Sequence, residues 1–183
     1  MRAGVERAVV RARAEAEKES SIQAPKTSET FFAVYDWVSV RIGNDKEIGD
    51  MMYPAESLEA RFTNNQSKIM LLAAMLESAF PDSTRINKVH MRKKFELNLE
   101  FNIRSIEGMP HDAAGAGIVF ASAVSKRYGT SPPASRASMK GALRADKHGL
   151  WIMLNPEIGQ EKGLMRDDGA ARNGALFGPG KQS

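Results

Sequence analysis

The chain has 183 residues, of which 42% are hydrophobic, and it carries a formal net charge of +4 at pH 7. This length and apolar share predict one folded domain with tails. The chain contains no cysteine, which excludes disulfides, thiolate nucleophiles and thiolate metal sites. We expect neither a signal peptide nor a membrane-spanning stretch, and therefore a soluble or membrane-peripheral protein. The mild basic bias fits binding to nucleic acid or to an anionic membrane surface.

Residues 1–29 are predicted to form a charged N-terminal arm and linker. Residues 1–19 are rich in Ala, Arg and Glu, and such a short, weakly apolar helix is marginal in water on its own. Two interpretations remain open, a frayed solvated tail or an arm that orders on a neighbouring subunit or a membrane. Residues 20–30 contain Ser20, Ser21, Pro25 and Ser28 and are typical of a linker.

The segment from Phe31 to Ile42 is predicted to be a strand, because apolar residues alternate along most of it. Gly43-Asn44-Asp45 then has the composition of a turn. After a mixed stretch limited by Pro54, a short helical turn is expected between Ser57 and Phe62.

The strongest helix and the strongest strand follow one another. From Lys68 to Phe80 the residues are mostly apolar at three-four spacing, which predicts a helix buried on most sides that ends before Pro81. From Phe95 to Ile103, apolar and polar residues alternate over nine positions, which predicts an antiparallel strand with one buried face. We expect the helix to pack across that face.

The last third of the chain is less regular. Residues 118–124 fit either a strand, which we favour, or an Ala-rich helix. Residues 126–147 are predicted to be an exposed basic loop that leads into a short helix. Residues 150–154 are expected to form a buried strand closed by Pro156, and residues 157–183 a loose tail.

Together these elements predict an α+β fold with a single small antiparallel sheet packed on a buried helix and with flexible N- and C-terminal tails. The core domain is expected to span residues 30–156.

No sequence pattern indicates an enzyme. His90, His111 and His148 are not in metal-ligand spacing, and Phe120 stands where the third Gly of a dinucleotide-binding pattern after Gly115 and Gly117 would be. There is also no Gly-x-Ser-x-Gly elbow. We therefore expect no catalytic residue, no metal and no cofactor.

Positive charge is concentrated in two segments, one leading into the central strand and one between residues 126 and 147. They would meet if the basic end of the strand faced the second segment. The residues expected to contact a membrane or a nucleic acid are Arg92, Lys93, Lys94, Lys126, Arg127, Arg136, Lys140, Arg144 and Lys147.

The order of these elements resembles that of rhabdovirus matrix proteins over roughly residues 30–156. The likeness lies in a strand that begins at Phe31-Phe32, the apolar helix from Lys68 to Leu76, the Lys93–Leu99 step from basic residues into a strand, and the Gly149–Pro156 strand. Animal members usually carry a Pro-Pro-x-Tyr motif, whereas Pro132-Pro133 is followed here by Ala134-Ser135. This departure leaves open a divergent or plant-infecting lineage.

This resemblance implies a viral structural protein that self-associates, binds the inner face of an anionic membrane and condenses the helical nucleocapsid. Its partners would be itself, the viral nucleocapsid, the membrane and RNA. Its location would be the virion, the host cytoplasm and the inner face of a host membrane. We expect self-association through Arg7, Val9, Arg11, Phe31 and Phe32.

Two other interpretations stay open. The same basic residues fit an RNA-binding capsid or nucleocapsid subunit, although only Tyr128 lies near the second basic segment to stack on a base. The third interpretation is a small globular domain with a solvated charged surface.

Overall fold

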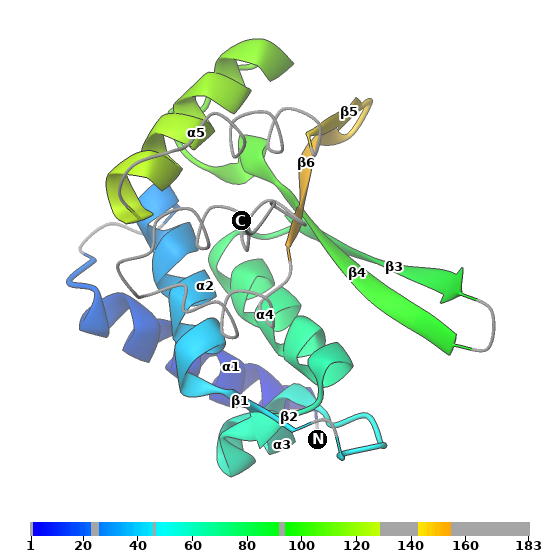
Figure 1. Ribbon diagram of the computed structural model, residues 1–183. Coiled ribbons are helices and arrows are strands. Elements are labelled where there is room, and N and C mark those ends of the chain that lie inside the picture. Colours follow the sequence, from blue (N-terminus) through cyan, green and yellow to red (C-terminus); the bar gives the residue numbers. More distant parts are fainter. Residues whose placement is uncertain (1, 23–25, 46, 92–93, 129–142, 155–183) are drawn as a thin grey trace.

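The computed structural model describes residues 2–22, 26–45, 47–91, 94–128 and 143–154 (Figure 1). These residues form an α+β fold, which confirms the predicted class. The helices are α1 (Arg2–Glu19), α2 (Ser28–Arg41), α3 (Pro54–Ala60), α4 (Asn65–Ala79), the short 3-10 helix η1 (Ile103–Ser105) and α5 (Ala113–Tyr128). The strands are β1 (Gly43–Asn44), β2 (Phe62–Thr63), β3 (Thr84–Met91), β4 (Lys94–Asn102), β5 (Arg144–Asp146) and β6 (Gly149–Leu154).

The main sheet is antiparallel and has the strand order β3-β4-β6-β5. Helices α2 and α4 cover one face of it, and both reach Phe101 of β4. The ring centroid of Phe101 lies 4.7 Å from that of Phe31 in α2 and 5.3 Å from that of Phe80 at the end of α4. Contacts between aromatic rings thus help to join the helices to the sheet in the core.

Helix α4 and strand β4 form the packing unit that the sequence predicts. The helix begins earlier than expected, after Asn64, whose side chain accepts a hydrogen bond from the Ser67 N–H at 2.8 Å. Leu72 of α4 and Leu99 of β4 are both fully buried in the same core. The predicted strand at residues 150–154 is confirmed as β6, and four of its five residues there are buried.

The predicted strand from Phe31 to Ile42 is wrong, because the segment forms helix α2. Thr27 caps the helix by accepting a hydrogen bond from the Thr30 N–H at 3.4 Å. The apolar residues that suggested alternation also recur at helical spacing, and residues 30–39 are all buried. A helix that is apolar on every side shows no clear period, so its aromatic and β-branched residues imitate a buried strand.

The preferred strand at residues 118–124 is also wrong. Helix α5 covers this segment and starts beside Asp112, whose carboxylate accepts a hydrogen bond from the Gly115 N–H at 2.7 Å. Ala116, Phe120 and Val124 are buried at four-residue spacing. The Ala-rich helix that the sequence left open is therefore the correct interpretation.

Residues 1–29 do not form a solvated tail throughout. Val9, Ala12 and Ala16 of α1 are buried within the hydrophobic core, and α1 contacts α2, α3 and α4. The arm therefore orders on its own domain. The predicted C-terminal tail at residues 157–183 lies outside the described residues.

Two short connections differ from expectation in detail. The predicted turn at residues 43–45 begins with β1, which pairs in parallel with β2. The expected helical turn at residues 57–62 belongs to α3, which starts with Pro54 and ends at Ala60. Proline suits the first turn of a helix because its missing N–H would have no intrahelical partner there.

Candidate anion-contact surface

A long hairpin carries the first predicted basic segment. β3 and β4 pair from Thr84 opposite Phe101 to Met91 opposite Lys94. Among the described residues, β6 pairs with β4 from Leu99 to Asn102. The distal half of the hairpin extends away from the helices (Figure 1). We call residues 86–98 the hairpin arm.

The hairpin arm is positively charged. Its sequence contains four basic residues, Lys88, Arg92, Lys93 and Lys94, and one acidic residue, Glu96, which gives 4 − 1 = +3. Lys94 is the first residue of β4, whereas Arg92 and Lys93 lie outside the described residues. The arm therefore contributes a large part of the net charge of +4 of the whole chain.

The second predicted basic segment is split between two places. Lys126 is exposed in the last turn of α5, and Arg144 and Lys147 lie in β5 and in the turn that follows it. Arg136 and Lys140 are outside the described residues.

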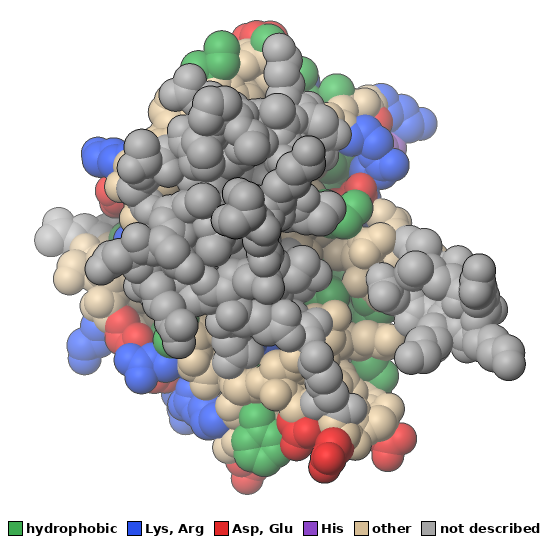
Figure 2. All heavy atoms as spheres, in the orientation of Figure 1, with side chains coloured by type: hydrophobic (Ala, Val, Ile, Leu, Met, Phe, Trp, Pro, Cys, Tyr) green, Lys and Arg blue, Asp and Glu red, His purple; other side chains and the backbone are tan. Residues whose placement is uncertain are grey.

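β5 joins the sheet near Asn102, since Trp151 pairs with both Asn102 and Arg144. Asn102 and Lys94 are at opposite ends of β4, about 26 Å apart at roughly 3.3 Å per residue. The structure thus separates the tip of the hairpin arm, at Lys94, from Arg144 and Lys147. On the face shown in Figure 2, Lys and Arg side chains occur in separate groups with Asp and Glu among them.

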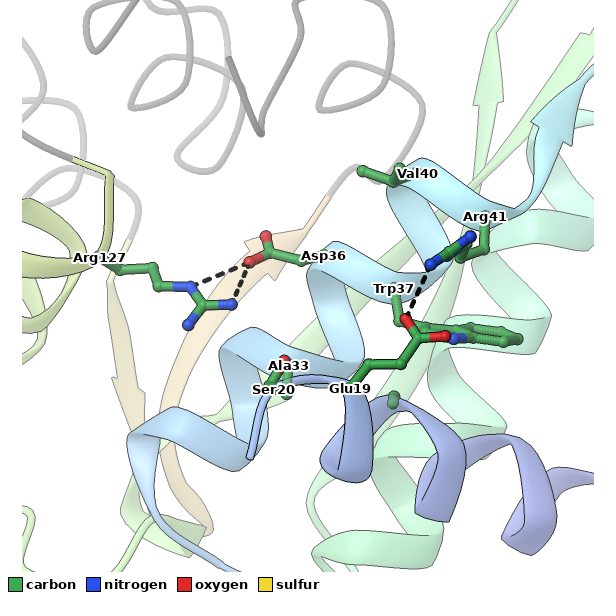
Figure 3. A pocket seen from close by; sticks show the side chains of 9 residues that line it. Glu19, Ser20, Ala33, Asp36, Trp37, Val40, Arg41 and Arg127 are labelled. Atoms are coloured by element: carbon green, nitrogen blue, oxygen red, sulfur yellow. Dashed lines mark hydrogen bonds and ion pairs between the residues drawn. The ribbon is translucent and has the colours of Figure 1, made fainter. Parts of the chain in front are cut away.

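Arg127 is an ion-pair partner inside the fold. Its guanidinium donates two hydrogen bonds to Asp36 Oδ2, from Nε at 3.1 Å and from Nη2 at 2.9 Å (Figure 3). The Asp36 side chain is only 5% exposed and that of Arg127 30%. This pair joins the last turn of α5 to the middle of α2, so Arg127 is less available for an external anion than the sequence suggested.

Arg144 belongs to a network on the sheet face opposite the helices. Its Nη2 lies 3.0 Å from Glu100 Oε1, and Glu100 also accepts hydrogen bonds from Arg85 and Asn87. Arg144 itself remains 63% exposed while the Glu100 side chain is 9% exposed. Arg144 is therefore accessible to solvent or to a partner, whereas the buried Glu100 carboxylate is bonded by residues of its own chain.

Arg85 links this network to Trp151 and Asp146. The Arg85 guanidinium carbon lies 3.8 Å from the centroid of the Trp151 ring, and its Nη1 lies 2.9 Å from Asp146 Oδ2. The Trp151 indole N–H donates a hydrogen bond to Asp146 Oδ1 at 2.9 Å. This hydrogen bond, followed by those from Arg85 and from the His148 backbone N–H, holds the pKa of Asp146 well below its ordinary value despite the opposing effect of desolvation.

β3 was not predicted from the sequence, so Arg85, which counts among the basic residues that support RNA binding, was not placed in a strand. On the inward face of β3, Lys88 follows Thr84 and Ile86, so the apolar alternation that marks a strand is interrupted. Two features could have predicted β3. One is the short connection after α4 at Pro81–Ser83, and the other is the need of the predicted strand β4 for a neighbouring strand.

A hollow of about 230 Å³ lies between α1, α2 and α5 (Figure 3). Its apolar lining comes from Ala16, Ala33, Trp37 and Val40. Its charged groups form two ion pairs, Asp36 with Arg127 and Glu19 with Arg41 at 3.2 Å. Because each positive charge in the hollow is paired with a negative one, the lining residues have no excess positive charge to attract an anion.

The expected self-association residues are corrected by their burial. Phe31, Phe32 and Val9 are core residues of a single chain, so they do not present a surface to a second copy. Arg7 and Arg11 are exposed on α1 and remain predictions.

Within the described part of the chain, no helix is long and apolar enough to cross a membrane, and no group of three or more His, Asp or Glu side chains is placed to hold a metal ion. Comparisons with protein-family models, with curated proteins and with solved structures found no match for this chain.

Proposed function

We propose that the protein is a viral structural protein of the matrix type, without enzymatic activity, that binds an anionic membrane surface and self-associates. In this role it would also condense the nucleocapsid, at the inner face of a host membrane and in the virion. One observation carries the proposal, the extension of the β3–β4 hairpin, with its basic sequence, away from the helices.

A projecting arm suits contact with a flat anionic surface. Each Lys or Arg near such a membrane contributes about 1 kcal/mol, and the attraction decays within a Debye length of about 8–10 Å. Charges at the end of an arm can come within that distance while the acidic groups of the body stay farther away. The same number of cations spread over the body would not have this advantage.

The second candidate is an RNA-binding capsid or nucleocapsid subunit. The arm supports it as well, because phosphates attract the same cations without requiring fixed geometry. The two candidates differ in the anion that the arm prefers, and one experiment can compare them.

The test uses two double variants with equal loss of charge. Arg92→Gln/Lys93→Gln removes two cations from the arm, and Lys18→Gln/Lys26→Gln removes two exposed cations from elsewhere. Binding would be measured by flotation with vesicles containing phosphatidylserine, with neutral phosphatidylcholine vesicles as background, and by fluorescence anisotropy with single-stranded RNA. Both assays would be run across a salt series.

We expect the arm variant to bind anionic vesicles about thirtyfold more weakly than wild type, since about 2 kcal/mol is lost. The control variant should stay within about threefold, a ratio worth less than 1 kcal/mol. Equal weakening of both variants would show that only net charge matters and would contradict the proposal. Strong RNA binding by wild type, without vesicle binding, would replace it by the second candidate.

A further inference from the structure

One end of the molecule, at α3 and β2, exposes large apolar side chains. Tyr53 is 73% exposed, and Met51 and Phe62 are each 48% exposed. Their neighbours in the chain face the interior, since Thr63 is buried and its hydroxyl donates a hydrogen bond to the Met52 sulfur at 3.3 Å. Exposed apolar side chains that gather among polar residues mark an interaction surface.

Hydrogen bonds hold the segments of this end together. The Ser57 hydroxyl of α3 donates to Thr63 Oγ1 of β2 at 3.2 Å. The Met52 N–H, in the loop before α3, donates to Ser67 Oγ of α4 at 2.8 Å. The three exposed side chains therefore come from segments that are packed against one another and against the core.

The same end is acidic. Residues 47–63, which we call the acidic end, contain four acidic residues and one basic residue, which gives 1 − 4 = −3. All four acidic side chains are exposed, and none of them forms an ion pair with another described residue: Glu47, Asp50, Glu56 and Glu59. The basic residue, Arg61, is engaged elsewhere, 4.0 Å from Glu15 and 5.2 Å from the centroid of the Trp37 ring. Figure 2 shows Asp and Glu side chains around a hydrophobic one at this lower edge.

The β5–β6 turn, at the other end of the molecule from α3 and β2 (Figure 1), is basic. It presents the exposed side chains of Arg144 and Lys147. The acidic residue between them, Asp146, is bonded by Arg85 at 2.9 Å, so its charge is offset within the chain. The two cations therefore remain as the charge that this turn offers to a partner.

An exposed apolar side chain accompanies these cations. Trp151 pairs with Arg144 across the sheet, and Met153 follows two residues later in β6, on the same face. Met153 is 47% exposed. We call Arg144, Lys147 and Met153 the basic end. It combines cations with an adaptable apolar side chain, as the acidic end combines carboxylates with apolar ones.

We propose that the acidic end of one copy of the chain binds the basic end of a second copy. Arg144 and Lys147 of one copy would lie among the carboxylates of the other, where charge-assisted hydrogen bonds form. The exposed Tyr53 ring offers the same cations a cation–π contact. Tyr, Met and Arg are also enriched in protein interfaces.

Such a contact joins two different surfaces of the same chain, so it is heterologous. Each dimer keeps one free acidic end and one free basic end, to which further copies can add. The hairpin arm of every copy stays free for an anionic membrane. The inference rests on the proposed function because a matrix-type role requires self-association. It is tested without lipid or RNA, so its failure would leave the vesicle result unaffected.

The test uses two variants of the full-length chain that each change one end. Glu47→Lys/Glu59→Lys reverses two exposed charges of the acidic end, and Arg144→Gln/Lys147→Glu removes the cations of the basic end. The control, Glu29→Lys/Glu107→Lys, reverses two exposed carboxylates elsewhere and has the same net charge as the acidic-end variant. Circular dichroism checks the fold of each variant.

Self-association would be measured by sedimentation equilibrium between about 20 μM and about 600 μM. Each end variant alone should associate at least about tenfold more weakly than wild type, and the control should stay within about threefold. An equimolar mixture of the two end variants should form a one-to-one dimer and nothing larger. Only one intact acidic end and one intact basic end remain in that mixture.

A wild type that stays monomeric, or two end variants that do not combine, would overturn the proposal. Wild-type association of Arg144→Gln/Lys147→Glu would also overturn it, because another cationic surface, such as the hairpin arm, would then occupy the acidic end. If an end variant does not fold, NMR of the wild-type chain at the two concentrations decides. Amide shifts should change at the acidic end and at the β5–β6 turn, and changes confined to other residues would contradict the contact.

Discussion

The pair of Asp36 and Arg127 shows how one residue can be misread from sequence. Arg127 lies in a run of cations, yet its guanidinium bonds a nearly buried carboxylate at 2.9 Å. Removing one partner of a buried pair leaves an uncompensated charge, which costs more than the pair contributes. Because the Arg127 side chain is 30% exposed, solvent reduces this penalty.

We expect Arg127→Met to lower the free energy of unfolding by about 1–3 kcal/mol, measured by urea unfolding followed by circular dichroism. The neighbouring Lys126 is exposed, and Lys126→Met should change stability by less than about 0.5 kcal/mol. If the two variants were equally stable, the ion pair would not hold α5 against α2.

Asp146 should give the stability a specific acid dependence. Its pKa is lowered in the folded chain, chiefly by the Trp151 hydrogen bond, so folding favours the ionised form. The resulting stabilisation is present above the ordinary pKa of about 3.9 and is lost as the pH falls from there towards the folded pKa.

Asp146→Asn should therefore be less stable than wild type at pH 7, but its melting temperature should fall less between pH 5 and pH 3. Asp50→Asn changes an exposed carboxylate elsewhere and should follow the wild-type profile. If the melting temperatures of wild type and Asp146→Asn fell in parallel with pH, the contacts of Asp146 would not stabilise its ionised form.

At the scale of elements, α1 is the largest departure from expectation, and it can be tested within the helix itself. Ala16 is 1% exposed, while Ala14 is exposed on another face of α1. Ala16→Asp should destabilise the chain by at least about 3 kcal/mol, because it buries an unpaired charge.

Ala14→Asp should cost less than about 1 kcal/mol, the difference in helix propensity. Thermal unfolding by calorimetry measures both variants. If both variants melted at the wild-type temperature, α1 would not belong to the folded core.

The predictions were correct for elements in which the hydrophobic residues follow a single clear period. β4 alternates over nine residues and α4 repeats at three-four spacing, so both were found, together with their mutual packing. α2 failed because burial on every side removes the polar face that defines a helical period. α5 was ambiguous because its many Ala and Gly residues carry little information about periodicity.

The candidate site was predictable in composition but not in arrangement. The two basic segments are visible in the sequence. The burial of Asp36 and Glu100, which engages Arg127 and Arg144, depends on contacts between residues 91 and 44 positions apart. Long-range contacts of this kind leave no local signal.

At the scale of the whole molecule, the distance between the two basic groups determines whether one anionic surface can contact both of them. Lys94, at the tip of the hairpin arm, and Asn102, near which β5 joins the sheet, lie at opposite ends of β4, about 26 Å apart at roughly 3.3 Å per residue. This is about three Debye lengths in physiological salt. Each group is therefore screened from the other. In the proposed function, an anionic membrane at the arm would leave Arg144 and Lys147 accessible to a different anionic partner.

The bond between Trp151 and Asp146 also provides a built-in optical probe. The chain has two tryptophans; Trp37 lies in α2, on the helical side of the core, and Trp151 lies in the sheet. In a Trp37→Phe background, the remaining indole emission would report the state of the sheet alone. Acid titration of that emission, compared with the far-ultraviolet helical signal, would show whether the sheet around the Trp151–Asp146 hydrogen bond opens before the helices unfold.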